Sequence, residues 1–211
     1  THVGGTLAAL GINASLKGMA PGALIDAYSS TSDVSEMTAA GAAYGGDPGK
    51  IYISNHSYGY YRGWDGNTWF GSFSNDGNPA NDVDQYFGRY NSTSVSMDAM
   101  LASLPYLLPF MSAGNQRNDG PPSTGATWTV SGGASYTYDP AQHPAGDGQY
   151  KLGYDTLDEK KVCKNLMSIG AVNDAVSAGT RSTAAGTITD FSSTGPTDDG
   201  RIKPDVVALG G

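Results

Sequence analysis

Apolar and polar positions in the first quarter of the chain alternate between helical and strand patterns. Small residues recur at neighbouring helical positions in residues 1–10, THVGGTLAAL, which predicts a helix that can lie close to a neighbouring element. Ser and Asp capping residues and the Gly45-Gly46 pair bound a second predicted helix within residues 30–46. Apolar strands are predicted at 23–28 and within 50–59. Strands that alternate with helices in this way are typical of a parallel sheet.

The same alternation returns after an interruption. A helix is predicted over 95–105, with Met97, Met100 and Leu101 on one face, and a strand over 106–115. Strand-like segments follow at 165–172 and 203–209. We therefore expect one α/β domain over residues 1–211. It carries two irregular surface insertions rich in Gly, Asn, Asp and aromatic residues, near 60–95 and 116–160.

Composition narrows the partners and the chemistry. The net charge is −8 and the 12 basic residues are spread along the chain, so nucleic acid is not an expected partner. The longest apolar run, PYLLPFM, is far shorter than the roughly 20 residues needed to cross a bilayer, so no membrane partner is expected. Cys163 is the only cysteine; it cannot form an internal disulfide and is expected to be a small buried hydrophobe.

Three stretches carry the strongest functional signal: THVGGT at 1–6, SAGN at 112–115 and FSSTGPTDDGRIKPDVVALGG at 191–211. In this order they resemble the subtilisin-like serine peptidases (subtilases, peptidase family S8). NHSYG at 55–59 is similar to that family's substrate-binding edge strand, and KNLMSIGAVND at 164–174 is similar to a later block. The resemblance implies a three-layer α/β fold with a mainly parallel sheet and helices on both faces, truncated at both ends.

The resemblance also implies which residues act. Asn115 matches the oxyanion asparagine of the family, and the small residues Ser112, Ala113 and Gly114 before it would form one wall of the first specificity pocket. On the other wall, Ser57, Tyr58 and Gly59 would offer unpaired backbone groups that an extended peptide can join as an added strand. Tyr58 stands where the family often has leucine, which predicts an aromatic pocket wall. Polypeptides are therefore the expected substrates.

The triad itself is expected outside these residues. THVGGT enters the family's histidine block at its third position, so His2 matches a structural histidine that packs the helix, and the catalytic base would lie two residues before Thr1. The orienting aspartate would lie further upstream and the nucleophilic serine downstream. The resemblance thus predicts a segment of a secreted serine endopeptidase that is inactive by itself.

Several alternatives stay open. The parent protein could be a catalytically dead peptidase-like module that binds peptides, or the chain could be an unrelated carbohydrate-binding domain that uses Trp64 and Trp69. His56 and His143 are expected to be surface or loop residues. No organic cofactor is implied, but family members often bind stabilising calcium; the acidic run at 75–84 is read as a solvated loop, with a structural calcium ion as the alternative.

Overall fold

The computed structural model describes residues 2–72, 86–142 and 154–210, and the chain divides into two compact units, 1–39 and 40–211. The first unit contains helix α1 (His2–Ala8), the short 3₁₀ helix η1 (Ala14–Leu16) and most of helix α2 (Asp33–Ala40). Gly18 and the two residues after it return along α1, where Gly18 N–H donates to the Ala9 carbonyl at 2.9 Å. A Cβ on Gly18 would lie 2.5 Å from the Ala9 nitrogen, so this close return requires glycine.

The predicted strand at 23–28 is wrong. These residues are irregular, and Leu24 is fully exposed. A strand is stabilised by a hydrogen-bonded partner, and within residues 2–39 the structure describes no strand that could pair with this segment. The apolar pattern alone therefore did not produce a strand.

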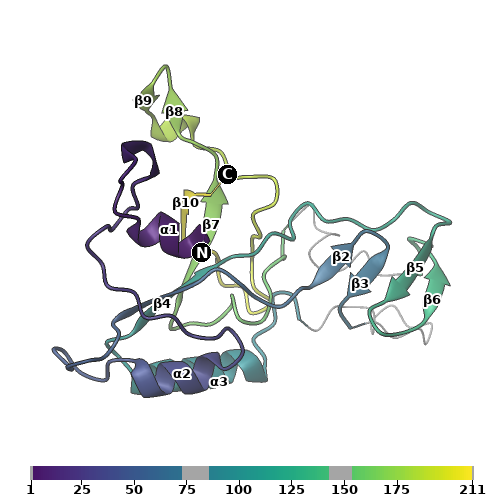
Figure 1. The fold of residues 1–211 in the computed structure, drawn as a ribbon. Helices are drawn as coiled ribbons and strands as arrows, with labels where there is room; N and C mark the ends of the chain where they lie inside the picture. Colours follow the sequence, from purple (N-terminus) through teal and green to yellow (C-terminus); the bar gives the residue numbers. More distant parts are fainter. Residues whose placement is uncertain (1, 73–85, 143–153, 211) are drawn as a thin grey trace. The chain divides into compact units, whose positions relative to one another are not determined.

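A parallel sheet organises the second unit (Figure 1). Its strands occur in the order β1 (Ile53–His56), β4 (Leu108–Ser112), β7 (Met167–Val172) and β10 (Val206–Leu209), and each neighbouring pair is parallel. Ile53 lies opposite Leu108, and Phe110 lies opposite Met167. The strands predicted at 50–59, 106–115, 165–172 and 203–209 are confirmed, as is the α/β class.

Helix α3 (Ser92–Ser103) lies between β1 and β4 in the chain. The Asn91 side chain caps it by accepting the Thr93 N–H at 2.9 Å, and the predicted face of Met97, Met100 and Leu101 is buried. Asp98, also buried, accepts the backbone N–H groups of Lys164 and Asn165. The helix is thus anchored to the segment that leads into β7.

Cys163 belongs to that segment. Its side chain is fully buried, as predicted, and burial together with the nearby Asp98 carboxylate raises the pKa of its thiol to about 12. At neutral pH the thiol is therefore protonated, the form that is a poor nucleophile.

The described parts of the two predicted insertions contain strands. They form a second sheet in the order β2 (Gly63–Asp65), β3 (Thr68–Phe70), β5 (Thr127–Val130) and β6 (Ser135–Thr137) (Figure 1). The parallel pair of β3 and β5, with Trp69 opposite Val130, joins one insertion to the other. Aromatic side chains from this sheet and from neighbouring segments form a buried core: Trp64, Trp69, Phe87, Trp128 and Tyr138.

Those buried rings remove the basis for a carbohydrate site at Trp64 and Trp69. The two side chains are 1% and 0% exposed, and their ring centroids lie 5.2 Å apart. A sugar stacks on an exposed aromatic face, which neither ring offers. The tryptophans therefore act as packing residues.

A small hairpin, β8 (Val176–Ser177) with β9 (Thr180–Arg181), and the 3₁₀ helix η3 (Thr183–Ala185) complete the described elements. Among the residues that the structure describes, no helix is both long and apolar enough to cross a membrane.

Candidate functional site

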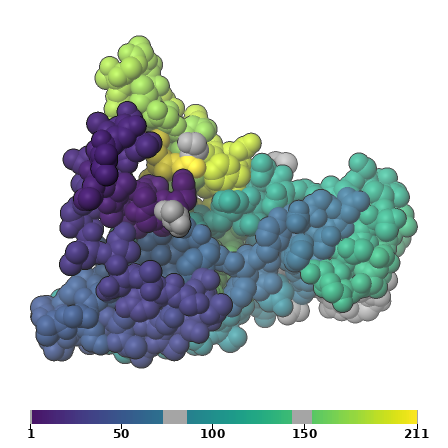
Figure 2. Space-filling model, in the orientation of Figure 1, coloured from purple at the N-terminus to yellow at the C-terminus, as the bar shows by residue number. Residues whose placement is uncertain are grey.

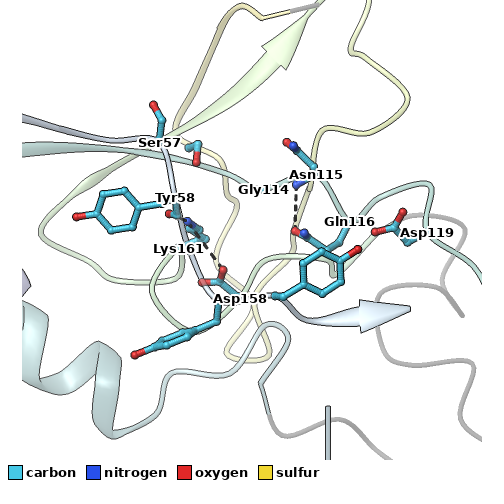
Figure 3. A pocket seen from close by; sticks show the side chains of 12 residues that line it. Ser57, Tyr58, Gly114, Asn115, Gln116, Asp119, Asp158 and Lys161 are labelled. Atoms are coloured by element: carbon cyan, nitrogen blue, oxygen red, sulfur yellow. Dashed lines mark hydrogen bonds and ion pairs between the residues drawn. The ribbon is translucent and has the colours of Figure 1, made fainter. Parts of the chain in front are cut away.

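A cavity of about 430 Å³ opens where β1 and β4 end (Figure 3). Because the two strands are parallel neighbours, the segments that follow them, 57–61 and 112–116, leave the sheet on the same side. Predicted site residues from both segments line this cavity: Ser57, Tyr58, Gly59, Ser112, Gly114 and Asn115. Ala113 is 2% exposed and packs instead against the buried Leu157 and Val162.

Asn115 is exposed at the rim of the cavity. Its backbone N–H donates to Gln116 Oε1 at 3.0 Å, whereas its side-chain amide makes no hydrogen bond within the described part of the chain. Figure 3 shows the side chain extending away from Asp158 and Lys161. The amide is thus available as a donor to a bound molecule.

The loop that carries Asn115 is held by Ser193. The Gly114 carbonyl accepts the Ser193 N–H at 2.9 Å, and the Ser193 hydroxyl accepts the Gln116 N–H at 3.1 Å. Gly114 has φ +112°, and a Cβ there would lie 2.6 Å from Gln116 Oε1 and 2.9 Å from Ser193 Oγ. Gly114 is therefore required both by its backbone angle and by the lack of space.

Two buried charges lie under the opposite wall of the cavity. Lys161 Nζ donates to the Tyr58 carbonyl at 2.7 Å and lies 3.9 Å from Asp158 Oδ2. A Cβ on Gly59 would approach Lys161 Nζ to 2.6 Å and Asp158 Oδ2 to 2.7 Å, so glycine is needed there to make room for the pair. Burial raises the pKa of Asp158, and the nearby Lys161 ammonium opposes that rise.

The backbone of the 57–59 segment is only partly open. Ser57 and Gly59 make no backbone hydrogen bond within the described residues, but the Tyr58 carbonyl is occupied by Lys161. The expectation that all three residues offer unpaired groups is therefore corrected for Tyr58. A peptide that joins this edge would use the groups of Ser57 and Gly59.

One histidine differs from expectation. His56 was expected at the surface, yet it is 7% exposed in β1, and its ring nitrogens contact the Tyr58 hydroxyl at 2.7 Å and Ser54 Oγ at 2.9 Å. The Tyr58 ring extends away from Asp119 (Figure 3). His2 lies in α1, and its side chain is exposed. His143 and the acidic run at 75–84 lie outside the described residues.

Sequence reasoning missed several lining residues: Tyr60, Tyr61, Gln116, Asp119, Asp158 and Lys161. One signal was present for the last two, because Asp158 and Lys161 lie between the apolar Leu157 and Val162, and charges in such a setting are candidates for burial. Within 2–72, 86–142 and 154–210, no three His, Cys, Asp or Glu side chains gather as a metal site requires.

Comparison with known proteins identifies the family of this chain. No curated protein matches the chain, but the model of the subtilase family (Peptidase_S8) matches residues 1–211. The match spans the whole sequence and includes every segment that lines the cavity. The chain therefore belongs to the subtilase family of serine peptidases.

Proposed function

We propose that this chain is part of a secreted subtilase endopeptidase, in which the cavity binds a polypeptide substrate and Asn115 stabilises the oxyanion. One observation carries the proposal: an asparagine with an unbonded side-chain amide lies at the rim of the cavity, on a loop held in place by Ser193.

The chemistry follows from charge. When a serine attacks a peptide carbonyl, the carbonyl oxygen becomes negative, and a fixed donor at that oxygen stabilises the transition state more than the ground state. The Asn115 amide is such a donor, and the hydrogen bonds between its loop and Ser193 limit its reorganisation during the reaction.

The substrate backbone would lie along the wall opposite Asn115. Ser57 and Gly59 can exchange backbone hydrogen bonds with an extended peptide, which is recognition that tolerates many sequences. The side chain that precedes the scissile bond would then enter the cavity between this segment and Gly114.

The resemblance assigns the aspartate, histidine and serine of the triad to the parent protein outside these 211 residues. The histidine would deprotonate the serine, and the aspartate would orient the histidine. The isolated chain is accordingly proposed to be inactive.

The mechanism needs no organic cofactor, and a structural calcium ion is a separate proposal. If one is present in the parent protein, adding EDTA will lower the melting temperature and calcium will restore it.

The experiment compares Asn115→Ala with Asn118→Ala in the full-length parent. Asn118 is exposed in the same loop and does not line the cavity. Asn115→Ala is expected to lower kcat about 10²–10³-fold with little change in KM, a magnitude taken from subtilisin, itself a member of this family. Asn118→Ala should leave both constants unchanged.

Two further readouts separate the alternatives. A fluorophosphonate should label the wild-type parent, since this reagent reacts with activated serines. A parent that binds peptides but neither cleaves them nor reacts is the peptide-binding module instead. Detection of the mature parent only inside the cell would contradict secretion.

A further inference from the structure

The charges that line the cavity are unequally engaged. Among the described residues, three carboxylate or ammonium side chains line it: Asp119, Asp158 and Lys161. Their charges sum to −1. The charge that a substrate side chain can bind therefore depends on which of the three already have hydrogen bonds or ion pairs within the protein.

Lys161 is satisfied. Its side chain is 1% exposed, and its ammonium donates to the Tyr58 carbonyl at 2.7 Å. It therefore has little capacity to hold a negative group of the substrate.

Asp158 is less well satisfied. Its Oδ1 accepts the Lys160 N–H at 3.0 Å, while Oδ2 lies 3.9 Å from Lys161 Nζ, which is beyond hydrogen-bond distance. Within the described residues Oδ2 accepts no hydrogen bond. A buried carboxylate in this condition gains strongly from a cation that can donate to it.

Apart from Lys161, the cation that acts on Asp158 among the described residues is Arg62, and it is bound elsewhere. Arg62 is held by Glu159 through bonds of 2.6 and 3.2 Å, and its guanidinium stacks 3.8 Å from the Tyr86 ring centroid. Asp119 adds a second carboxylate to the lining, and burial and the neighbouring Asp65 raise its pKa. Within the described residues Asp119 has no ion pair, and Asp158 has only the ion pair with Lys161 at 3.9 Å.

The remaining lining suits a long side chain. Tyr60 and Tyr61 line the cavity, and aromatic rings pack well against the methylene stem of lysine or arginine. Gly59 and Gly114 line the cavity without a side chain that could block such a stem.

We propose that this pocket selects a lysine or arginine side chain before the scissile bond, with Asp158 as the specificity-determining residue and Asp119 as a second carboxylate. The inference rests on the proposed function, because it takes the cavity as the pocket that receives that side chain.

The test uses the full-length parent and peptides that differ only in the residue before the scissile bond: lysine, norleucine, phenylalanine or glutamate. Norleucine keeps the shape of the lysine stem without its charge. We expect kcat/KM for lysine to exceed that for norleucine about tenfold to a hundredfold, the range for a hydrogen bond to a charged group.

Three variants identify the group responsible. Asp158→Asn should bring the ratio of kcat/KM for lysine to that for norleucine close to one. Asp119→Asn should lower the same ratio by a smaller factor. If circular dichroism shows that Asp158→Asn does not fold, Asp119→Asn becomes the test of whether a carboxylate selects the charged side chain. Asp174→Asn removes the same charge at an exposed site outside the cavity and should leave the ratio unchanged.

Other results would overturn the inference. Charge selection is refuted if the wild type cleaves after lysine and norleucine at equal rates, or fastest after phenylalanine. A preference for glutamate would instead identify Lys161 as the group that binds the substrate side chain. A parent that cleaves no peptide and resists a fluorophosphonate fails the proposed function instead. The same peptides, measured by calorimetric binding, would then still show whether the pocket prefers lysine.

Discussion

The Ser193 hydroxyl accepts the backbone N–H of Gln116 at 3.1 Å, which ties the loop of Asn115 to a segment 77 positions further along the chain. Ser193 is fully buried and does not line the cavity, so it acts on a substrate only through this loop. It is a positioning residue for Asn115.

Removing the Ser193 hydroxyl should therefore affect turnover more than substrate binding. We expect Ser193→Ala in the full-length parent to lower kcat about tenfold with little change in KM, because a displaced donor loses part of its transition-state stabilisation. Steady-state kinetics measures this, with Ser177→Ala on exposed β8 as the matched control. A rise in KM at constant kcat would contradict a positioning role.

Gly59 should not tolerate even one methyl group. In Gly59→Ala the new Cβ would meet Lys161 Nζ and Asp158 Oδ2, and both charged groups are buried. We expect a loss of about 1–3 kcal/mol in the free energy of unfolding, the usual cost of overpacking, together with weaker substrate binding. Urea denaturation measures the first effect and KM the second. Gly22→Ala, where the described residues leave open space, is the control and should leave both unchanged.

The aromatic core of the second sheet should contribute strongly to stability. Trp64 is 1% exposed and packs 5.2 Å from Trp69 and 5.3 Å from Trp128 between ring centroids. We expect Trp64→Ala to cost about 3–5 kcal/mol and Trp64→Phe much less, as judged by denaturant unfolding. The exposed Tyr154→Ala should cost less than about 0.5 kcal/mol. If Trp64→Ala and Tyr154→Ala both lower the free energy of unfolding by the same small amount, this aromatic core does not unfold cooperatively with the rest of the protein.

Tyr90 should make stability sensitive to alkaline pH. Burial, and then the hydrogen bond that its hydroxyl donates to Asp98 at 2.8 Å, raises the pKa of Tyr90 from 10 to about 12. Between these values the unfolded chain loses a proton that the folded chain keeps, so the contribution of Tyr90 is complete below pH 10 and is lost as the pH rises through 12.

The test is the free energy of unfolding at pH 8 and pH 11 for the wild type and Tyr90→Phe. The wild type should lose more stability over this interval than the variant, and the exposed Tyr106→Phe should behave like the wild type. An identical loss in all three proteins would show that the Tyr90 hydroxyl is not linked to folding.

Short-range patterns were sufficient for a large part of this protein. The parallel strands β1, β4, β7 and β10 and the buried face of α3 follow from periodicity that each segment carries within itself. The blocks at 55–59 and 112–115, through their resemblance to subtilases, predicted part of the cavity lining, and parallel neighbouring strands bring the two blocks to the same side of their sheet.

Contacts between distant segments required the tertiary structure. The apolar pattern at 23–28 predicts a strand, yet no partner strand is described in its unit. Trp69 and Val130 pair between two segments that were both predicted to be irregular. Asp158 and Lys161 lie beside the 57–59 segment, where a Cβ on Gly59 would clash with both. Local patterns record whether a residue suits burial or a strand; they do not record which distant residue will pack, pair or share its charge.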